Sequence, residues 1–262
     1  MFFSPFERSF LLIITLLTIP TIRSQSVYDE ESPLLKASIE NSSIDDINRL
    51  LGEGFSPNVK NSAGWTPLIF AVNNNNENIV KNLINAGASI DETENDGWSA
   101  LLFAVFRESI ELAEILLTNN ANPYILSVQG ISPFSIASER HLTPVLSAIE
   151  RYRERRATIE QMNGNLLDAC LEGDKDSIEN LLTNGAEVNS FNSVGYSPLI
   201  AAARNACLEC VRILIQAGAD VYHKEKDGWT ALMFASTSVN IYLLIIFHNT
   251  LITFKSRALS KS

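Results

Sequence analysis

The chain has 262 residues, of which 46% are hydrophobic and 19% charged, and its formal net charge is −10. This composition is typical of a globular protein and excludes a disordered one. The negative charge argues against a nucleic-acid-binding protein, because binding to phosphates needs a basic face. The dense basic run at Arg151, Arg153, Arg155 and Arg156 is interrupted by glutamates, and it is typical of a solvated helix face.

The N-terminus has the pattern of a secretory signal peptide. Arg8 precedes an apolar stretch at 10–19, and Ser24 and Ser26 form a small-x-small cleavage pattern. The apolar stretch is too short to cross a bilayer comfortably. We therefore expect residues 1–26 to be a signal peptide and the protein to enter the secretory pathway or be secreted. An uncleaved anchor, a frayed terminus and a cytoplasmic protein are the alternatives.

The chain then repeats itself at intervals of 33 residues. The positions that recur are Gly64, Gly97 and Gly130; Gly195 and Gly228; Ala71, Ala104 and Ala137; and Ala169, Ala202 and Ala235. Each unit opens with a turn, a Thr or Ser, often a Pro, and an apolar residue, as in Thr66-Pro67-Leu68. The hydroxyl can cap a helix, and Pro suits the first helical position. A second helical pattern follows and ends at a glycine such as Gly87, which predicts two helices per unit.

These residues resemble the ankyrin-repeat family, whose repeat reads T-P-L-H-x-A with a period of about 33 residues. The resemblance covers about 32–236 and implies an all-α, ankyrin-type helical solenoid with short β-turn fingers and about seven units. The units begin near Pro33, Ser62, Asn95, Val128, Asn165, Ser193 and Lys226. The family's histidine is absent from every copy, where Ile69, Leu102, Ser135, Ile200 and Met233 stand instead. We expect apolar contacts to replace most of its polar link between turns.

The junction between the fourth and fifth units departs from the pattern. No glycine stops the helix near Arg153, so we expect it to run on to about Gln161, with a turn at 163–165. The expected organisation is repeats 1–4 in 27–150, an extended helix and a junction without a finger in 151–165, and repeats 5–7 in 166–236. The pattern favours one continuous solenoid, with two modules joined by a stiff helix as the alternative.

Residues 237–262 form an apolar tail of uncertain role. Within it, 239–254 is apolar nearly all round, although a terminal repeat needs a polar outer face for solubility. Leu243 to Phe247 fall where a second helix of the last repeat should be. The segment is consistent with a poor cap, a short membrane segment, or a chain end that is not the natural one.

The three cysteines are Cys170, Cys207 and Cys210, and an odd, small number does not make a disulfide framework. The C-x-x-C pair at 207 and 210 could be a redox pair or half a zinc site. No further ligands lie nearby with suitable spacing, and the repeat pattern explains both positions without a metal. We expect neither a metal nor a cofactor.

Nothing in the sequence points to assembled catalytic chemistry. It has no phosphate loop and no nucleophile elbow, and its histidines fall in separate units. We expect no catalytic residues and no enzymatic activity. The resemblance implies a monomeric scaffold that binds another protein, of unknown identity, on the concave face of the stack. The alternatives are a regulatory or targeting module of a larger membrane or enzymatic protein, and, less favoured, an enzyme in an ankyrin frame.

An aromatic residue directly follows the turn glycine in four of the units. Aromatic side chains dominate the energetics of protein interfaces. The candidate partner-binding residues are Trp65, Trp98, Tyr196 and Trp229 after the turns, and Asn73, Asn74, Phe106, Arg107, Arg204 and Asn205 at the ends of first helices. The other interpretation is that each aromatic ring shields the base of the next turn.

Overall fold

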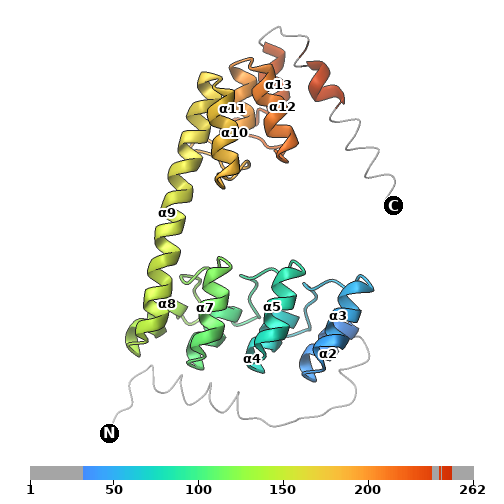
Figure 1. The fold of residues 1–262 in the computed structure, drawn as a ribbon, viewed down its shortest axis with the longest axis vertical. Helices are drawn as coiled ribbons and strands as arrows, with labels where there is room; N and C mark the ends of the chain where they lie inside the picture. Colours follow the sequence, from blue (N-terminus) through green and yellow to red (C-terminus); the bar gives the residue numbers. More distant parts are fainter. Residues whose placement is uncertain (1–31, 238–241, 243, 250–262) are drawn as a thin grey trace. The chain divides into compact units, whose positions relative to one another are not determined.

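A computed structural model describes residues 32–237, 242 and 244–249 (Figure 1). The expected signal peptide at 1–26 lies outside these residues. The described residues form helices, turns and two isolated β-bridges, Thr93 with Ser99 and Lys224 with Thr230. The expected all-α ankyrin-type solenoid is therefore confirmed. The chain divides into two compact units, residues 1–149 and 150–262, which are treated separately below.

In the first unit, short first helices alternate with longer second helices, and the two helices of a repeat lie side by side (Figure 1). The helices are α2 (Pro33–Ile39), α3 (Ile44–Gly52), α4 (Pro67–Asn73), α5 (Glu77–Asn85), α6 (Ala100–Phe106), α7 (Ile110–Thr118), α8 (Pro133–Glu139) and the beginning of α9 (Thr143–Glu172). Most first helices begin with a hydroxyl cap: the Thr66 side chain accepts a hydrogen bond from Ile69 N at 3.2 Å, and Ser99 accepts one from Leu102 N at 3.2 Å. This confirms the capping role predicted for Thr66, Ser99, Ser132, Ser197 and Thr230, whereas the side chain of Ser32 makes no such bond.

The second unit contains the rest of α9, α10 (Lys175–Thr183), α11 (Pro198–Arg204), α12 (Leu208–Gln216) and α13 (Ala231–Thr237). Its core is built from buried aliphatic side chains of these helices, with Leu166, Leu199 and Leu214 among the most buried. First helices again pack against first helices, as α11 does against α13. The second unit thus repeats the construction of the first.

The turns between repeats are short fingers, at 61–65, 94–98, 127–131, 192–196 and 225–229. In each finger the first residue donates its backbone N–H to the carbonyl of the fifth, as Glu94 does to Trp98 at 3.1 Å. The side chain of that first residue also accepts two backbone N–H groups: Glu94 Oε1 accepts from Asp96 N at 3.0 Å and from Trp98 N at 2.9 Å. Asn61, Ser127, Asn192 and Glu225 accept the corresponding pairs in the other fingers. These bonds satisfy turn amides that no helix or sheet would satisfy.

Neighbouring fingers are joined by backbone hydrogen bonds, from Asn95 N to the Ala63 carbonyl at 3.0 Å and from Val128 N to the Asp96 carbonyl at 2.8 Å. This contact brings the next finger very close to the turn glycine. A β-carbon added at Gly97, whose φ is +81°, would lie 2.9 Å from Ser127 Cα. At Gly130, with a φ of +75°, no described atom would lie within 4 Å, because α9 replaces the finger that would follow.

Helix α9 corrects one expectation. Its 30 residues continue without interruption through Asn163, Gly164 and Asn165, so the turn predicted at 163–165 is wrong. The break comes instead after Glu172, where Gly173 has a φ of +77°. An Asn-Gly pair does not end a helix whose flanking residues are strong helix formers, because its cost is only about 1 kcal/mol per glycine.

One side chain of α9 makes a contact that belongs to the loop before the finger in other repeats. Asn163 Oδ1 accepts from Glu187 N at 2.7 Å, and its Nδ2 donates to Glu187 Oε2 at 3.0 Å. In regular repeats a loop residue makes this contact: Asn58 accepts from Ser89 N at 2.7 Å, and Asn189 accepts from Asp220 N at 2.8 Å. A helix therefore supplies the acceptor that a loop supplies elsewhere.

The described part of the apolar tail packs against the second unit. Phe247 is 1% exposed and belongs to the buried core, and the partly buried Leu244 and Ile246 pack against this core. Tyr242 and Ile245 remain exposed. No helix among the described residues is both long enough and apolar enough to cross a membrane. The described tail residues thus contribute to the core of a repeat.

If Phe247 is a core residue, replacing it with alanine should destabilise the second unit. We expect Phe247→Ala to lower the free energy of unfolding by about 3–5 kcal/mol, because it removes buried area and leaves a cavity. Ile245→Ala on the same segment, where the side chain is half-exposed, should cost about 1 kcal/mol or less. Chemical denaturation of both variants measures the difference. Equal, small effects would mean that the tail does not contribute to the core.

The two turn glycines provide a second test. Gly97→Ala and Gly130→Ala both place a β-carbon on a left-handed residue, at a cost of about 1–2 kcal/mol. Only the Gly97 variant also meets the backbone of the next finger, and we expect a further loss of about 1–3 kcal/mol from this overpacking. Thermal or chemical unfolding measures the gap. Similar losses in both variants would contradict the close finger contact.

Candidate binding surfaces

The candidate residues of the first unit gather in an aromatic row. The Trp65 ring lies 4.8 Å from the ring of Phe70 and 4.9 Å from that of Phe103, centroid to centroid. Trp98 in turn lies 5.0 Å from both Phe103 and Phe106. Spacings of this kind are favourable for aromatic pairs. The row thus joins three first-helix phenylalanines through two finger tryptophans.

Burial differs along this aromatic row. Trp98 is only 5% exposed, whereas Trp65 and Phe106 are half-buried. A buried ring offers little surface to a partner, so the position of Trp98 fits the shielding interpretation better than the contact one. Trp65 and Phe106 keep part of their surface in contact with solvent, and the Arg140 guanidinium lies 4.9 Å from the centroid of the Phe106 ring.

The polar candidates of the first unit connect neighbouring repeats. Arg107 Nη1 donates to the Asn73 carbonyl at 2.8 Å, and Asn74 Nδ2 donates to the Ser38 carbonyl at 3.0 Å. Arg140, which the sequence analysis did not single out, donates in the same way to the Phe106 carbonyl at 2.8 Å. Each of these carbonyls lies at or near the end of a first helix, where carbonyl groups lack helical partners. These side chains therefore stabilise the stack as well as bordering its surface.

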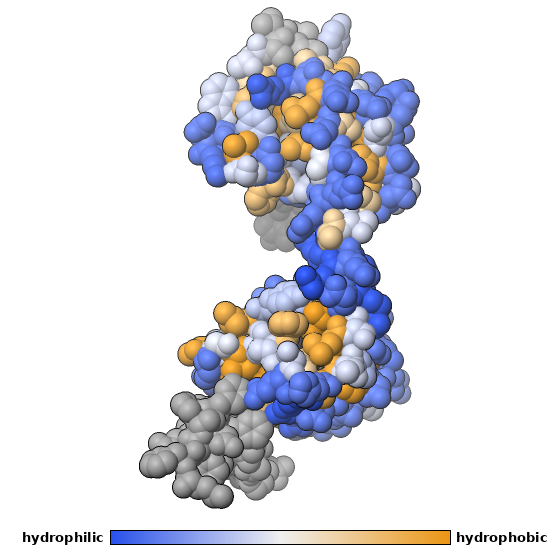
Figure 2. All heavy atoms as spheres, turned by 90° about the vertical axis from the view of Figure 1, so that its left-hand side faces the viewer, coloured by the Kyte–Doolittle hydropathy of each residue, from blue (hydrophilic) through white to orange (hydrophobic). Residues whose placement is uncertain are grey.

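The second unit holds a separate group of candidates. Phe234 on α13 contacts both finger aromatics, with ring centroids 5.6 Å from Tyr196 and 5.2 Å from Trp229. The guanidinium of Arg204 lies 5.7 Å from the centroid of the Tyr196 ring. Trp229 is 42% exposed, and Arg204 and Asn205 are exposed as well. The four aromatic candidates of the fingers therefore fall into two groups, one on each unit. Hydrophobic side chains reach the surface of both units in Figure 2.

The sequence analysis did not predict that Phe70, Phe103 and Phe234 contact the finger tryptophans, although their spacing in the sequence indicates it. Each of the three tryptophans is followed five residues later by a phenylalanine: Trp65 by Phe70, Trp98 by Phe103 and Trp229 by Phe234. Each finger tryptophan contacts the phenylalanine of its own first helix. The Trp-x-x-x-x-Phe spacing would have predicted these ring contacts.

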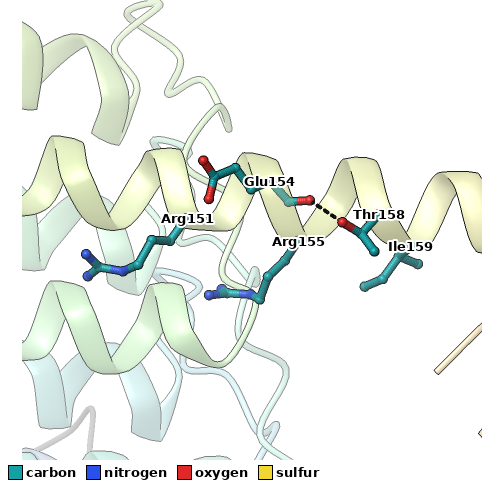
Figure 3. A pocket seen from close by; sticks show the side chains of 5 residues that line it. All are labelled: Arg151, Glu154, Arg155, Thr158 and Ile159. Atoms are coloured by element: carbon teal, nitrogen blue, oxygen red, sulfur yellow. Dashed lines mark hydrogen bonds between the residues drawn. The ribbon is translucent and has the colours of Figure 1, made fainter. Parts of the chain in front are cut away.

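The basic run on α9 lines a shallow depression of about 530 Å³ (Figure 3). Its lining residues are Arg151, Glu154, Arg155, Thr158 and Ile159, and Thr158 Oγ1 donates to the Glu154 carbonyl at 2.9 Å. The other two arginines of the run pair with carboxylates, Arg153 with Glu150 at 2.9 Å and Arg156 with Glu187 at 3.0 Å. A depression lined by one helix lacks the enclosing walls of a small-molecule site.

The structure adds a bond that the sequence left open. Cys207 and Cys210 form a disulfide across the first turn of α12, with their Cα atoms 5.3 Å apart. The sequence left a redox pair open at these positions, because spacing alone does not distinguish packed thiols from a bonded pair. Cys170 is a free, buried thiol. No group of three or more His, Cys, Asp or Glu side chains within the described residues could hold a metal ion.

Comparison with known proteins agrees with this architecture. The family model for ankyrin repeats (3 copies) matches residues 34–126 and 166–255, more than half of the chain. The chain belongs to the ankyrin-repeat family. Ankyrin repeats are generally protein-interaction modules, and members of the family are typically non-enzymatic scaffolds. The matched range also includes the described tail residues.

The chain is similar to parts of several longer proteins. It is 27% identical to human transient receptor potential cation channel subfamily A member 1 over 114 residues, which is 43% of this chain and 10% of the channel. It is 37% identical over 76 residues, 29% of this chain, to 16% of the ankyrin repeat, SAM and basic leucine zipper domain-containing protein 1 of Notamacropus eugenii. It is 33% identical over 73 residues to the human Notch-regulated ankyrin repeat-containing protein, covering 26% of this chain and 64% of that protein. The chain thus spans less than two thirds of each of these relatives.

Alanine substitution distinguishes a tryptophan that stabilises the fold from one whose side chain is exposed to solvent. Trp98→Ala should destabilise the first unit by about 3–5 kcal/mol, because it removes a buried ring that contacts two phenylalanines. Trp229→Ala should cost the second unit less, about 1–2 kcal/mol, since much of its ring is already in water. Equilibrium unfolding of the two variants measures both losses. A larger loss for Trp229→Ala would reverse this assignment.

Proposed function

We propose that the chain is a non-catalytic binding protein that holds a protein partner on the concave surface made by its fingers and first helices. The observation that carries this proposal is the exposure of Trp229 beside the half-exposed Tyr196 and the exposed Arg204 in the second unit. Trp, Tyr and Arg are the residue types that most often dominate binding energy at protein interfaces. Met233 adds an exposed apolar side chain on the neighbouring α13.

The first unit carries a separate, more polar group of candidate residues on its own fingers and first helices. The half-buried Trp65, Phe106, Asn73 and Asn74 belong to this group together with the exposed Arg107. Because Arg107 and Asn74 already donate to backbone carbonyls, they would contact a partner from fixed positions. Pre-ordered side chains lose less entropy on binding. Asn205 would extend the surface of the second unit at the end of α11.

The proposal is tested by isolating a partner with the full chain and then measuring the affinity of variants for it. We expect Trp229→Ala to weaken binding by about thirtyfold, the loss that corresponds to about 2 kcal/mol at a hot spot. Phe191→Ala is the matched control, because Phe191 is an exposed aromatic residue that stacks on His223 and is not among the candidate residues. An unchanged affinity for the folded Trp229→Ala protein would remove this residue from the interface.

An alternative function is a regulatory or targeting module of a larger membrane or enzymatic protein. The relatives support it, because the matched region makes up 10% of the human channel and 16% of the SAM and leucine zipper protein. Reading the transcript on both sides of the present sequence distinguishes the two functions. Further domains in the same reading frame would favour the module.

For the location of the protein we propose an oxidising compartment, such as the secretory pathway. The Cys207–Cys210 disulfide supports this, since disulfides persist in such compartments and are rare in the reducing cytosol. The signal-peptide pattern at 1–26 points the same way and remains a prediction. N-terminal sequencing of the mature protein from eukaryotic cells should find a start after about residue 24–26. An intact N-terminus on cytosolic protein would contradict the proposal.

A further inference from the structure

The disulfide occupies a particular place at the start of a helix. Cys207 is the N-cap of α12 and Cys210 is the third helical residue. Cys210 is fully buried at 0% exposure, whereas Cys207 is half-exposed. A thiolate that attacks the bond from solvent therefore reaches the sulfur of Cys207 first.

The bond adds little constraint to the fold. It closes a loop of only four residues, and the stabilisation that a disulfide gives through the unfolded chain falls as the loop shortens. The same residues are already held by the helix, where Val211 N donates to the Cys207 carbonyl at 3.1 Å. The disulfide is thus poorly suited to the role of a structural staple.

Helix α12 can also accommodate the reduced form of Cys207 and Cys210. Cys210 N donates to Cys207 Sγ at 3.3 Å, so the sulfur caps the helix, and a thiolate at this position would be a stronger acceptor. The partial positive charge of a helix N-terminus stabilises a thiolate. Cys207 Sγ also lies 3.9 Å from the Gly173 carbonyl, to which a reduced thiol could donate. Opening the bond would leave α12 capped and in contact with the turn before α10.

We propose that Cys207–Cys210 is a thiol–disulfide exchange site that reacts with dithiols through Cys207. The proposal goes beyond partner binding on the concave surface, because it requires no occupant there. Partners of the site would be small or protein dithiols that present an accessible thiolate. Two of the candidate binding residues lie nearby, Arg204 at the end of α11 and Asn205 in the turn that follows, so exchange would take place at the edge of the proposed binding surface.

The chemistry is balanced by the dithiol. One thiolate of the dithiol attacks Cys207 Sγ, forming a mixed disulfide while the Cys210 sulfur leaves as a thiolate and takes up a proton. The second thiol of the dithiol then loses its proton and attacks the dithiol sulfur of the mixed disulfide. Cys207 leaves as a thiolate and takes up a proton. The protein disulfide gains two electrons and two protons, and the dithiol loses them as it becomes a disulfide.

Cys170 serves as an internal comparison. It lies in the same core cluster on α9, and burial raises the pKa of its thiol to about 12. At neutral pH it therefore stays protonated, and it is shielded from reagents. A thiol of this kind neither attacks disulfides nor alkylates readily in the folded protein.

The first test measures reduction of the folded full-length chain. Dithiothreitol is added under native conditions, free thiols are trapped with an alkylating agent, and peptide mass mapping follows each cysteine. We expect Cys207 to become alkylated at least about tenfold faster than the protein unfolds globally, with the unfolding rate taken from hydrogen exchange. Cys170→Ala should leave this rate unchanged. Reduction only at the rate of global unfolding, or the absence of the bond from air-exposed protein, would overturn the proposal.

The second test uses variants that trap the mixed disulfide. Each variant is incubated with oxidised glutathione under native conditions, in which it is folded. Cys210→Ala keeps the exposed sulfur and an apolar core, and it should accumulate a glutathione adduct on Cys207. Cys207→Ser keeps an oxygen at the N-cap and should gain no adduct at the buried Cys210. Circular dichroism establishes that both variants are folded. An adduct on Cys210 in folded Cys207→Ser, or none on Cys207 in folded Cys210→Ala, would refute the assignment.

Discussion

A first helix of seven residues cannot bury its apolar face alone, and the remaining features of this protein follow from that constraint. Each first helix packs against the next, as α4 does against α6 and α11 against α13. The fingers then set the spacing between helices, because their backbone hydrogen bonds fix how closely one repeat approaches the next. At the other end of the first helices, Arg107 and Arg140 each donate a hydrogen bond to a backbone carbonyl of the preceding repeat. Helices α4 and α6 are thus held to their neighbours at both ends.

Local signals in the sequence predicted much of this architecture. Thr66 and Ser99 cap their helices, and the glycines occupy left-handed turn positions, because both features depend on residues a few positions apart. The side-chain acceptors of the fingers were not predicted, since Asn61, Glu94 and Ser127 share an acceptor atom and not a residue type. A search for repeated residue types does not detect a position that is occupied by Asn, Glu or Ser in different repeats.

Predictions that depend on competing energies were less successful. At 163–165, one glycine and two asparagines disfavour a helix, but the long run of helix formers on both sides outweighs them and the helix continues. The burial of Trp98 depends on Phe103 and Phe106, whose rings enclose it from the first helix of its own repeat. The bond between Cys207 and Cys210 could not be inferred from spacing that also suits two packed thiols. The ring contacts and the disulfide thus depend on tertiary neighbours, which spacing along the sequence does not reveal.

The glycines of the fingers show what is lost when repeats are averaged. Gly97 is required both by its backbone conformation and by the backbone of the finger that rests on it, whereas Gly130 is required by conformation alone. An alignment of the repeats gives the two positions the same letter and the same weight. A consensus sequence derived from such an alignment would record how often a residue recurs, and it would not distinguish an interior repeat from one beside an interruption. In this chain the neighbours of a repeat, as much as its own sequence, determine which substitutions it tolerates.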